Sequence, residues 1–194
     1  RGDGYLQIID GDSLLRLACA HDLVLEVHPT PGDYLTRGDP LLHAWPGERV
    51  DAALAGRISR CFVVGNQRTS EQDLGFPLAQ LVEMALRAMS PGINDPITAI
   101  SCVDRIGSAL TRLIQLDCPS RCLRDTHRRL RVWRADLSFP VVLDSALDPL
   151  REVARPNTAL TLRLMAVLTL IARHSTRDED RAALQRQAAI VCRE

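Results

Sequence analysis

The residues that could do chemistry are concentrated between residues 68 and 104, where polar and apolar side chains recur at helical spacing. Two helices are predicted there, on either side of the turn Ser90-Pro91-Gly92. Polar residues recur every three or four positions along each helix, which places them on one face. Where these faces converge, we predict a polar ligand-binding pocket. Its candidate residues are Arg68, Asp73, Glu83, Arg87, Asn94, Asp95 and Thr98.

These seven residues suit two arrangements. In a binding site, the arginines clamp an anion or a carboxylate, the acidic residues pair with them or ligate a cation, and the residues after the turn fix it or contact the ligand. In a purely structural arrangement, the same side chains form ion pairs and a helix cap, both of which are common. The pairs and cap would be Arg68 with Asp73, Glu83 with Arg87, and Asn94 or Asp95 as the cap, followed by Pro96.

No metal site or cofactor is predicted elsewhere. Cys118 and Cys122, followed by His127, offer ligand types that suit zinc. However, Pro119 interrupts any helix between the two cysteines, and the sequence has no second matched pair to complete four ligands. Nucleophilic catalysis has little support, because the sequence lacks a Gly-x-Ser-x-Gly motif. The histidines also lie in unrelated contexts, at His21, His28, His43, His127 and His174.

The densest charge cluster is a run of arginines between residues 121 and 134. Such a run is commonly a solvated face. Near a membrane it would attract anionic lipid headgroups, and the candidate lipid-facing residues are Arg128, Arg129 and Arg131.

Composition excludes several classes of function. Arginine supplies all 24 basic residues and lysine none, which excludes a biotin or lipoyl carrier, a pyridoxal Schiff base and the GK[ST] phosphate loop. The 24 acidic residues balance the charge and aromatic residues are only 4%, so nucleic acid is not an expected partner. Six cysteines at irregular spacings favour reduced thiols in a reducing compartment.

Residues 1–66 are predicted to form a β-rich lobe with short helices. Residues 4–10 alternate like a strand, residues 13–21 have helical spacing, and residues 23–27 form a second strand. Three turns rich in Pro and Gly then bracket short apolar pieces, and a strand over residues 58–64 closes the lobe. In outline the lobe is similar to small barrel-sandwich lobes, which without lysine would serve only as a rigid platform.

Residues 67–194 are predicted to be mainly helical and to form a bundle on which the lobe packs, so the fold class is α+β. Residues 158–172 are apolar on most faces and predict a central helix. The last helix is predicted to open with a capping box of Thr176 and Glu179. Residues 118–143 suit either a hairpin or a helix plus a strand, and residues 139–143 are strand-like.

The block from residue 68 to residue 100 resembles the bacterial predicted-membrane-protein family catalogued as domain of unknown function twenty-two fifty-four. The similarity rests on the segments QLVEMALRA, from Gln80, and SPGINDP, from Ser90, and more weakly on Pro31-Gly32-Asp33. The resemblance implies a transmembrane region that precedes a soluble C-terminal part, and this chain corresponds to that part. It also implies a location at the bacterial inner membrane, where we expect the chain on the cytoplasmic side. The family has no established reaction.

We therefore predict a regulatory, ligand-sensing or assembly domain of a bacterial membrane protein. Its expected partners are its own N-terminal transmembrane region and further copies of itself. Two alternatives stay open. One is a metal-assisted hydrolase that uses the carboxylates of Asp73, Glu83 and Asp95, and the other is a purely structural oligomerisation module. Binding is favoured over catalysis because the sequence has no HExxH or Gly-rich dinucleotide motif.

Overall fold

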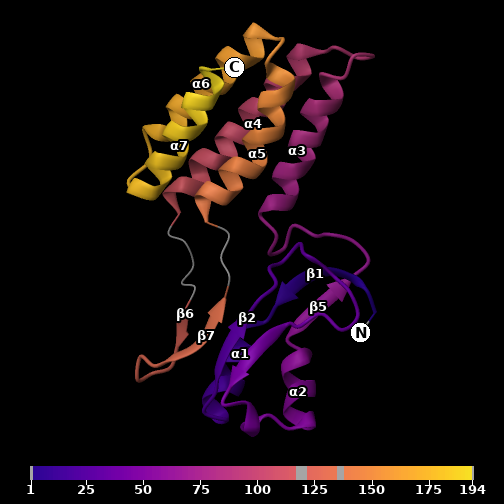
Figure 1. Cartoon of the computed structure of the whole chain (residues 1–194), viewed down its shortest axis with the longest axis vertical. Helices are drawn as coiled ribbons and strands as arrows, with labels where there is room; N and C mark the ends of the chain where they lie inside the picture. Colours follow the sequence, from indigo (N-terminus) through magenta and orange to yellow (C-terminus); the bar gives the residue numbers. More distant parts are fainter. Residues whose placement is uncertain (1, 117–121, 135–137, 194) are drawn as a thin grey trace. The chain divides into compact units, whose positions relative to one another are not determined.

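A computed structural model of the chain describes residues 2–116, 122–134 and 138–193. The chain divides into two compact units, each built from two stretches of sequence (Figure 1). The sheet unit comprises Arg1–Phe76 and Pro119–Asp136, and the helical unit comprises Pro77–Cys118 and Leu137–Glu194. The described residues contain seven α-helices and two sheets, with strands toward the N-terminus and helices toward the C-terminus. The fold class is therefore α+β, as predicted.

One sheet of the sheet unit has three antiparallel strands in the order β3-β1-β5. These are β1 (Gly4–Ile9), β3 (Tyr34–Leu35) and β5 (Phe62–Gly65). Leu6 of β1 pairs with Val64, and Ile9 pairs with Phe62. Leu6, Ile9 and Phe62 are buried, so this sheet contributes one face to the core of the unit.

The second sheet has four strands in the order β4-β2-β7-β6. These are β2 (Val24–Val27), β4 (Leu42–Trp45), β6 (Cys122–Arg124) and β7 (Leu130–Arg134). β2 pairs with β7 in parallel and with β4 in antiparallel orientation. β6 and β7 form an antiparallel hairpin, so the hairpin alternative is confirmed within residues 122–134. Leu25, Val27 and Val132 have no exposed surface, because one face of this sheet packs on the core.

Short helices complete the sheet unit. They are α1 (Gly11–Ala20), a 3-10 turn η1 (Gly47–Arg49) and α2 (Ala52–Ser59). Aspartates cap both α-helices: the Asp10 carboxylate accepts the Ser13 N–H at 2.9 Å, and the Asp51 carboxylate accepts the Leu54 N–H at 2.7 Å.

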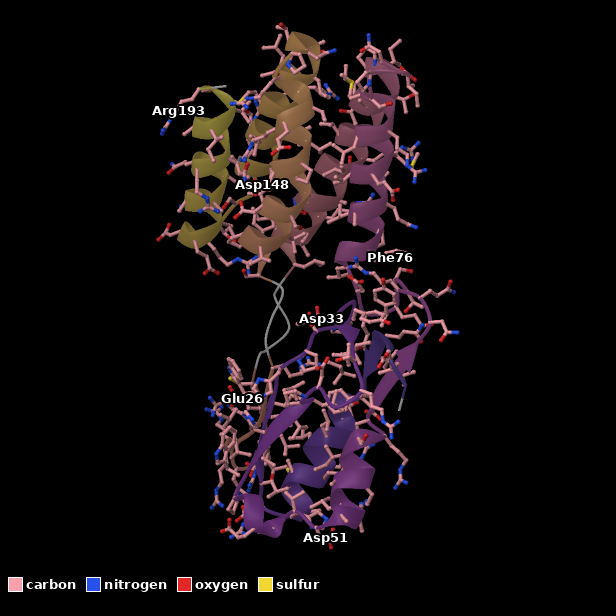
Figure 2. All side chains as sticks on the ribbon, turned by 45° about the vertical axis from the view of Figure 1, so that its right-hand side comes forward. Glu26, Asp33, Asp51, Phe76, Asp148 and Arg193 are labelled. Carbon is pink, nitrogen blue, oxygen red and sulfur yellow. The ribbon has the colours of Figure 1, made fainter. Side chains whose placement is uncertain are left out.

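Five further helices, between residues 75 and 191, carry an aliphatic core. They are α3 (Gly75–Ala88), α4 (Pro96–Gln115), α5 (Phe139–Ala154), α6 (Thr158–Ala172) and α7 (Asp178–Val191). The bounds of α6 agree with the predicted helix over residues 158–172. Helices α4 and α6 approach closely at Gly107, where a Cβ atom would lie 2.6 Å from Cγ1 of Val167. Glycine at this position therefore allows the close contact. Figure 2 shows how densely side chains fill each unit.

Three sequence predictions need correction. The strand expected over residues 58–64 begins only at Phe62, because the residues up to Ser59 belong to α2. Residues 139–143, expected to be strand-like, form the start of α5, because Phe139, Val142 and Leu143 begin an apolar stripe at helical spacing that a five-residue segment cannot reveal. The capping box at Thr176 is also wrong, because α7 begins at Asp178 and its cap position is Arg177, which makes no side-chain cap bond.

Candidate functional site

Two of the candidate residues, Arg68 and Asp73, form an ion pair in the sheet unit. Arg68 follows β5, and its Nε and Nη2 atoms lie 2.8 and 2.6 Å from Oδ2 of Asp73. The Asp73 carboxylate is 4% exposed, and its other oxygen accepts the N–H of Phe76 at 3.0 Å. The guanidinium of Arg68 also lies over the Phe76 ring, 5.3 Å from its centroid. Both charges are thus matched within the sheet unit.

The loop around this ion pair is held by the first strand and by a glycine turn. Gly32 has φ +102°, and a Cβ atom there would lie 2.3 Å from the Asp73 carboxylate. The turn that contains Gly32 therefore requires a residue without a side chain. The side chain of Gln72 accepts the Ile9 N–H at 2.9 Å. These contacts fix Asp73 in place, and its carboxylate oxygens accept hydrogen bonds from Arg68 and from the backbone of Phe76.

The remaining candidates lie in the helical unit. Glu83 and Arg87 form an ion pair four residues apart on α3, with exposed side chains. Asp95 caps α4, because its carboxylate accepts the N–H groups of Ile97 and Thr98 at 3.1 Å and the Thr98 hydroxyl at 2.6 Å. The bond from the Thr98 hydroxyl, followed by the bond from its N–H, lowers the pKa of Asp95 below its ordinary value.

Asn94 completes the turn before α4. Its backbone has φ +46°, a left-handed conformation that asparagine tolerates better than most residues, and its N–H donates to the Ser90 carbonyl at 2.9 Å. Of the seven predicted residues, Arg68 and Asp73 therefore lie together in the sheet unit. The other five belong to the helical unit, where each of the two acidic members has a partner within one helical turn.

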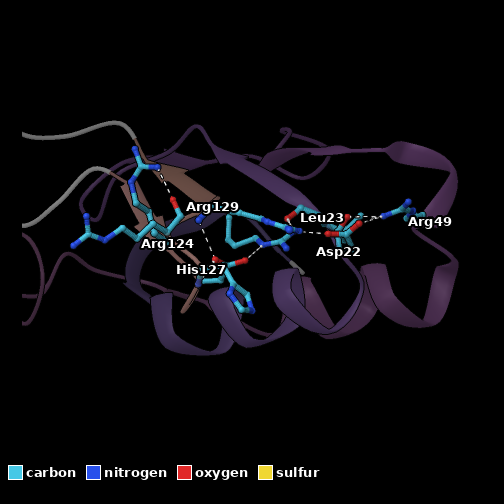
Figure 3. Close-up of polar contacts among 9 residues, drawn as sticks. Asp22, Leu23, Arg49, Arg124, His127 and Arg129 are labelled. Carbon is cyan, nitrogen blue, oxygen red and sulfur yellow. Dashed lines mark hydrogen bonds and ion pairs between the residues drawn. The ribbon is translucent and has the colours of Figure 1, made fainter.

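A second polar network centres on the arginine run. Arg131 of β7 is 8% exposed; its Nη1 lies 2.7 Å from Oδ1 of Asp22, and its Nε lies 2.9 Å from Oδ2 of Asp125. Arg49 binds the other oxygen of Asp22 at 2.7 Å (Figure 3). The bonds from Arg131, and secondarily from Arg49, lower the pKa of Asp22 to about 2. Arg131 thus ties the β7 strand to the start of β2.

The tip of the β6–β7 hairpin carries the other two predicted lipid-facing residues. Arg128 and Arg129 are both exposed, and Arg128 has a left-handed backbone with φ +61°. Asp125 shapes this turn, because its carboxylate accepts the N–H groups of His127 and Arg129 at 2.9 Å (Figure 3). Cys118 of the cysteine pair and Arg121 of the run lie outside the described residues.

One cluster of potential metal ligands was not predicted from the sequence. Glu26 and His28 of the β2 region meet His43 of β4, and one ligand atom from each lies within 4.8 Å of the others. The pattern Glu-x-His places the first two on one side of an extended chain. Only the pairing of β2 with β4 brings His43 beside them. That register was not predictable from the turns between residues 31 and 47.

Uncharacterized mycobacterial proteins are similar in sequence to this chain. The chain is 31% identical to an uncharacterized protein of Mycobacterium bovis, Mb1321c, and to one of Mycobacterium tuberculosis, Rv1290c. In both cases the match covers 98% of this chain, whereas the chain spans 37% of the length of these curated relatives. No solved structure matches it.

The helices among the described residues all lack the length and hydrophobicity that crossing a bilayer requires. The family model described as "Predicted membrane protein (DUF2254)" matches residues 1–169, which is most of the chain. The chain therefore belongs to this family of predicted membrane proteins.

Proposed function

We propose that this chain is an assembly and regulatory domain of a bacterial membrane protein, and that it pairs with a second copy of itself through α6. Association of two copies would bring their membrane-embedded parts together and so couple the state of the domain to the membrane region. We place the domain on the cytoplasmic side of the inner membrane, which its six irregularly spaced cysteines support.

The observation that carries this proposal is an apolar stripe on the outer face of α6. Leu162 is 66% exposed and Leu170 is 42% exposed. Ala159 and Ala166 are exposed beside them, at the spacing that keeps all four residues on one helix face. Apolar surface that stays in contact with water on a helix face is typical of a protein–protein interface.

The order of large and small residues along this stripe favours a second copy as the occupant. If two α6 helices pack antiparallel about a two-fold axis near residue 164, Leu162 of each copy meets Ala166 of the other. Ala159 then lies close to Leu170 of the other copy. Each large side chain thus faces a small one, so the stripe is complementary to itself, as a two-fold interface requires.

The charge beside the stripe is compatible with this pairing. Arg163 is the charged residue of α6, and it forms an ion pair with Asp104 of α4 in the same copy. That bond also raises the pKa of Arg163. Because the charge of Arg163 is matched within its own copy, this charge does not oppose the approach of a second α6 helix.

Native mass spectrometry and light scattering of the purified chain test the proposal. The chain should be a dimer, and Leu162→Glu should make it a monomer, because the carboxylate would be buried without a partner. Met84→Glu is the matched control: it places the same charge on α3 at a side chain that is 53% exposed, and the dimer should persist. Circular dichroism should be unchanged in both variants.

A rescue variant tests the register of the two helices. Adding Ala166→Arg to Leu162→Glu should restore the dimer, because the introduced carboxylate then meets the introduced guanidinium of the other copy. A monomeric parent chain would contradict the proposal. So would a dimer that survives Leu162→Glu, or one that dissociates equally with Met84→Glu.

A further inference from the structure

The sheet unit brings three metal-ligating side chains together on one face of the four-stranded sheet. Glu26 lies directly opposite His43 in the antiparallel pairing of β2 with β4, and His28 follows Glu26 by two residues. Nε2 of His28 lies 3.0 Å from Nδ1 of His43, and that same Nδ1 lies 4.0 Å from Oε2 of Glu26. Three ligand atoms thus converge from two hydrogen-bonded strands.

We infer that Glu26, His28 and His43 form a binding site for a divalent transition-metal ion such as Zn²⁺. Imidazole nitrogen and carboxylate oxygen are both ligands that zinc accepts, and two histidines with one carboxylate are a recurrent ligand set for zinc and for iron. In a tetrahedral zinc site, metal–ligand bonds of about 2.0–2.2 Å separate neighbouring ligand atoms by roughly 3.3 Å. The observed separations of 3.0 and 4.0 Å lie on either side of that value.

The backbone around the cluster limits how far its ligands can move. Glu26 and His43 belong to paired strands, and the N–H of His28 donates to the Leu41 carbonyl at 3.1 Å. The neighbouring residues Leu25 and Val27 point to the opposite, fully buried face. The strands therefore hold the backbone of the three residues, and the site closes by rotation of their side chains.

The face that carries the cluster is open to water. The side chain of His43 is 61% exposed and that of Glu26 is 33% exposed. Three protein ligands leave at least one position of a four-coordinate ion open, and this position would hold water or an incoming ligand. Without a metal, the two rings share one N–H···N hydrogen bond. Metal binding requires the proton of that N–H to move to the other nitrogen of the same ring, which leaves both facing nitrogens as ligands.

Both tryptophans of the chain lie beside the cluster and can report on it. The ring centroid of Trp45 is 5.8 Å from that of His43, and Trp133 of β7 is in register with Glu26. A bound paramagnetic ion such as Co²⁺ should therefore quench tryptophan fluorescence. It should also give visible absorption bands from the coordinated metal.

The test is a titration of the tag-free 194-residue chain with ZnCl2 by isothermal calorimetry, and with CoCl2 by fluorescence and visible absorption. One ion should bind per chain. His28→Gln and His43→Gln should each weaken binding by at least about tenfold, and Glu26→Gln by a smaller factor. These variants keep side chains of similar length at exposed or half-buried positions, so they should retain the circular dichroism spectrum of the parent.

His127→Gln is the matched control, because His127 is an exposed histidine of the same unit that lies outside the cluster. Its affinity for Zn²⁺ should equal that of the parent. The inference fails if the parent binds no Zn²⁺, if His28→Gln and His43→Gln leave the affinity unchanged, or if His127→Gln weakens it equally. This site goes beyond the assembly role of α6, and since assembly is measured by mass, the two proposals can fail separately.

Discussion

The buried arginine of β7 and the predicted polar residues of α3 and α4 find their partners at very different distances along the chain. In the sheet unit, Arg131 bonds to Asp22 across 109 positions of sequence. In the helical unit, Glu83 pairs with Arg87 four residues away, and Asp95 caps the helix that it precedes. Polar contacts within a helical turn therefore follow from the local sequence, whereas contacts between strands depend on a register that only the complete fold sets.

The largest expected effect is the loss of stability when a buried leucine is truncated. The apolar cores of the two units should contribute equally to the free energy of unfolding. Leu25 in the sheet unit and Leu110 in the helical unit both have no exposed surface. Replacing either with Ala should lower the free energy of unfolding by about 2–5 kcal/mol, since each change leaves a cavity. Urea unfolding followed by circular dichroism measures the loss. Leu74→Ala, at a side chain that is 57% exposed, is the control and should change little. A small loss for only one buried leucine would mean that its unit is loosely packed.

The next effect compares one substitution at a helical glycine in each unit. Gly107→Ala on α4 should destabilise the chain by about 1–3 kcal/mol, because its Cβ atom would overlap Val167 of α6. Gly56→Ala on α2 meets no atom within 4 Å and should stabilise it by about 0.5–1 kcal/mol, through better helix propensity. Thermal unfolding of both variants shows the sign directly. Equal shifts in the same direction would contradict the close α4–α6 contact.

A smaller effect concerns the caps of the helical unit. The Asn157 side chain accepts the Leu160 N–H at 3.0 Å at the start of α6, whereas Ser138 at the start of α5 makes no side-chain cap bond. Asn157→Ala should therefore cost about 1 kcal/mol of unfolding free energy, and Ser138→Ala should cost much less. Chemical denaturation of the two variants side by side decides this. A larger loss at Ser138 would show that the cap bond does not control α6.

The smallest effect is the pH dependence that Asp22 contributes in the sheet unit. The pKa of Asp22 falls from its ordinary value of 3.8 to about 2, chiefly because of the bond from Arg131. A lowered pKa means that the ionised carboxylate stabilises the fold above pH 3.8, and this contribution is lost as the pH falls toward about 2. NMR titration of the Asp22 carboxyl carbon measures the value. Arg131→Gln should raise this pKa more than Arg49→Gln, and the reverse order would contradict the assignment of causes.

Much of the fold could be predicted from local patterns. Helix α6 extends over the predicted residues because the whole segment is apolar on most of its faces. The cap at Asp95, with Pro96 after it, follows from the preferences of helix starts. The start of α5 could not be predicted, because the five residues from Phe139 suit a buried strand equally well, and their helical period emerges only over the full sixteen residues.

The contacts of the candidate sites also divide into those that local sequence predicts and those that depend on the complete fold. The pair of Glu83 with Arg87 is predictable from the sequence because it requires only the helix period. The approach of His28 to His43 was not predicted, because it requires the strand register across a long connection. The burial of Arg131 depends on Asp125, six residues away, and on Asp22, 109 residues away. The sequence shows the charge of Arg131, but the partner at Asp22 follows only from the fold.

The parallel pairing of β2 with β7 also constrains how the chain folds as it is synthesised. Leu25 pairs with Val132, so β2 has a free edge until more than a hundred further residues, including all of α3 and α4, have left the ribosome. An unpaired strand edge with a buried, apolar face is a template for association with other chains. The nascent protein therefore has an interval in which β2 needs protection, and that interval ends when β7 arrives to pair with it.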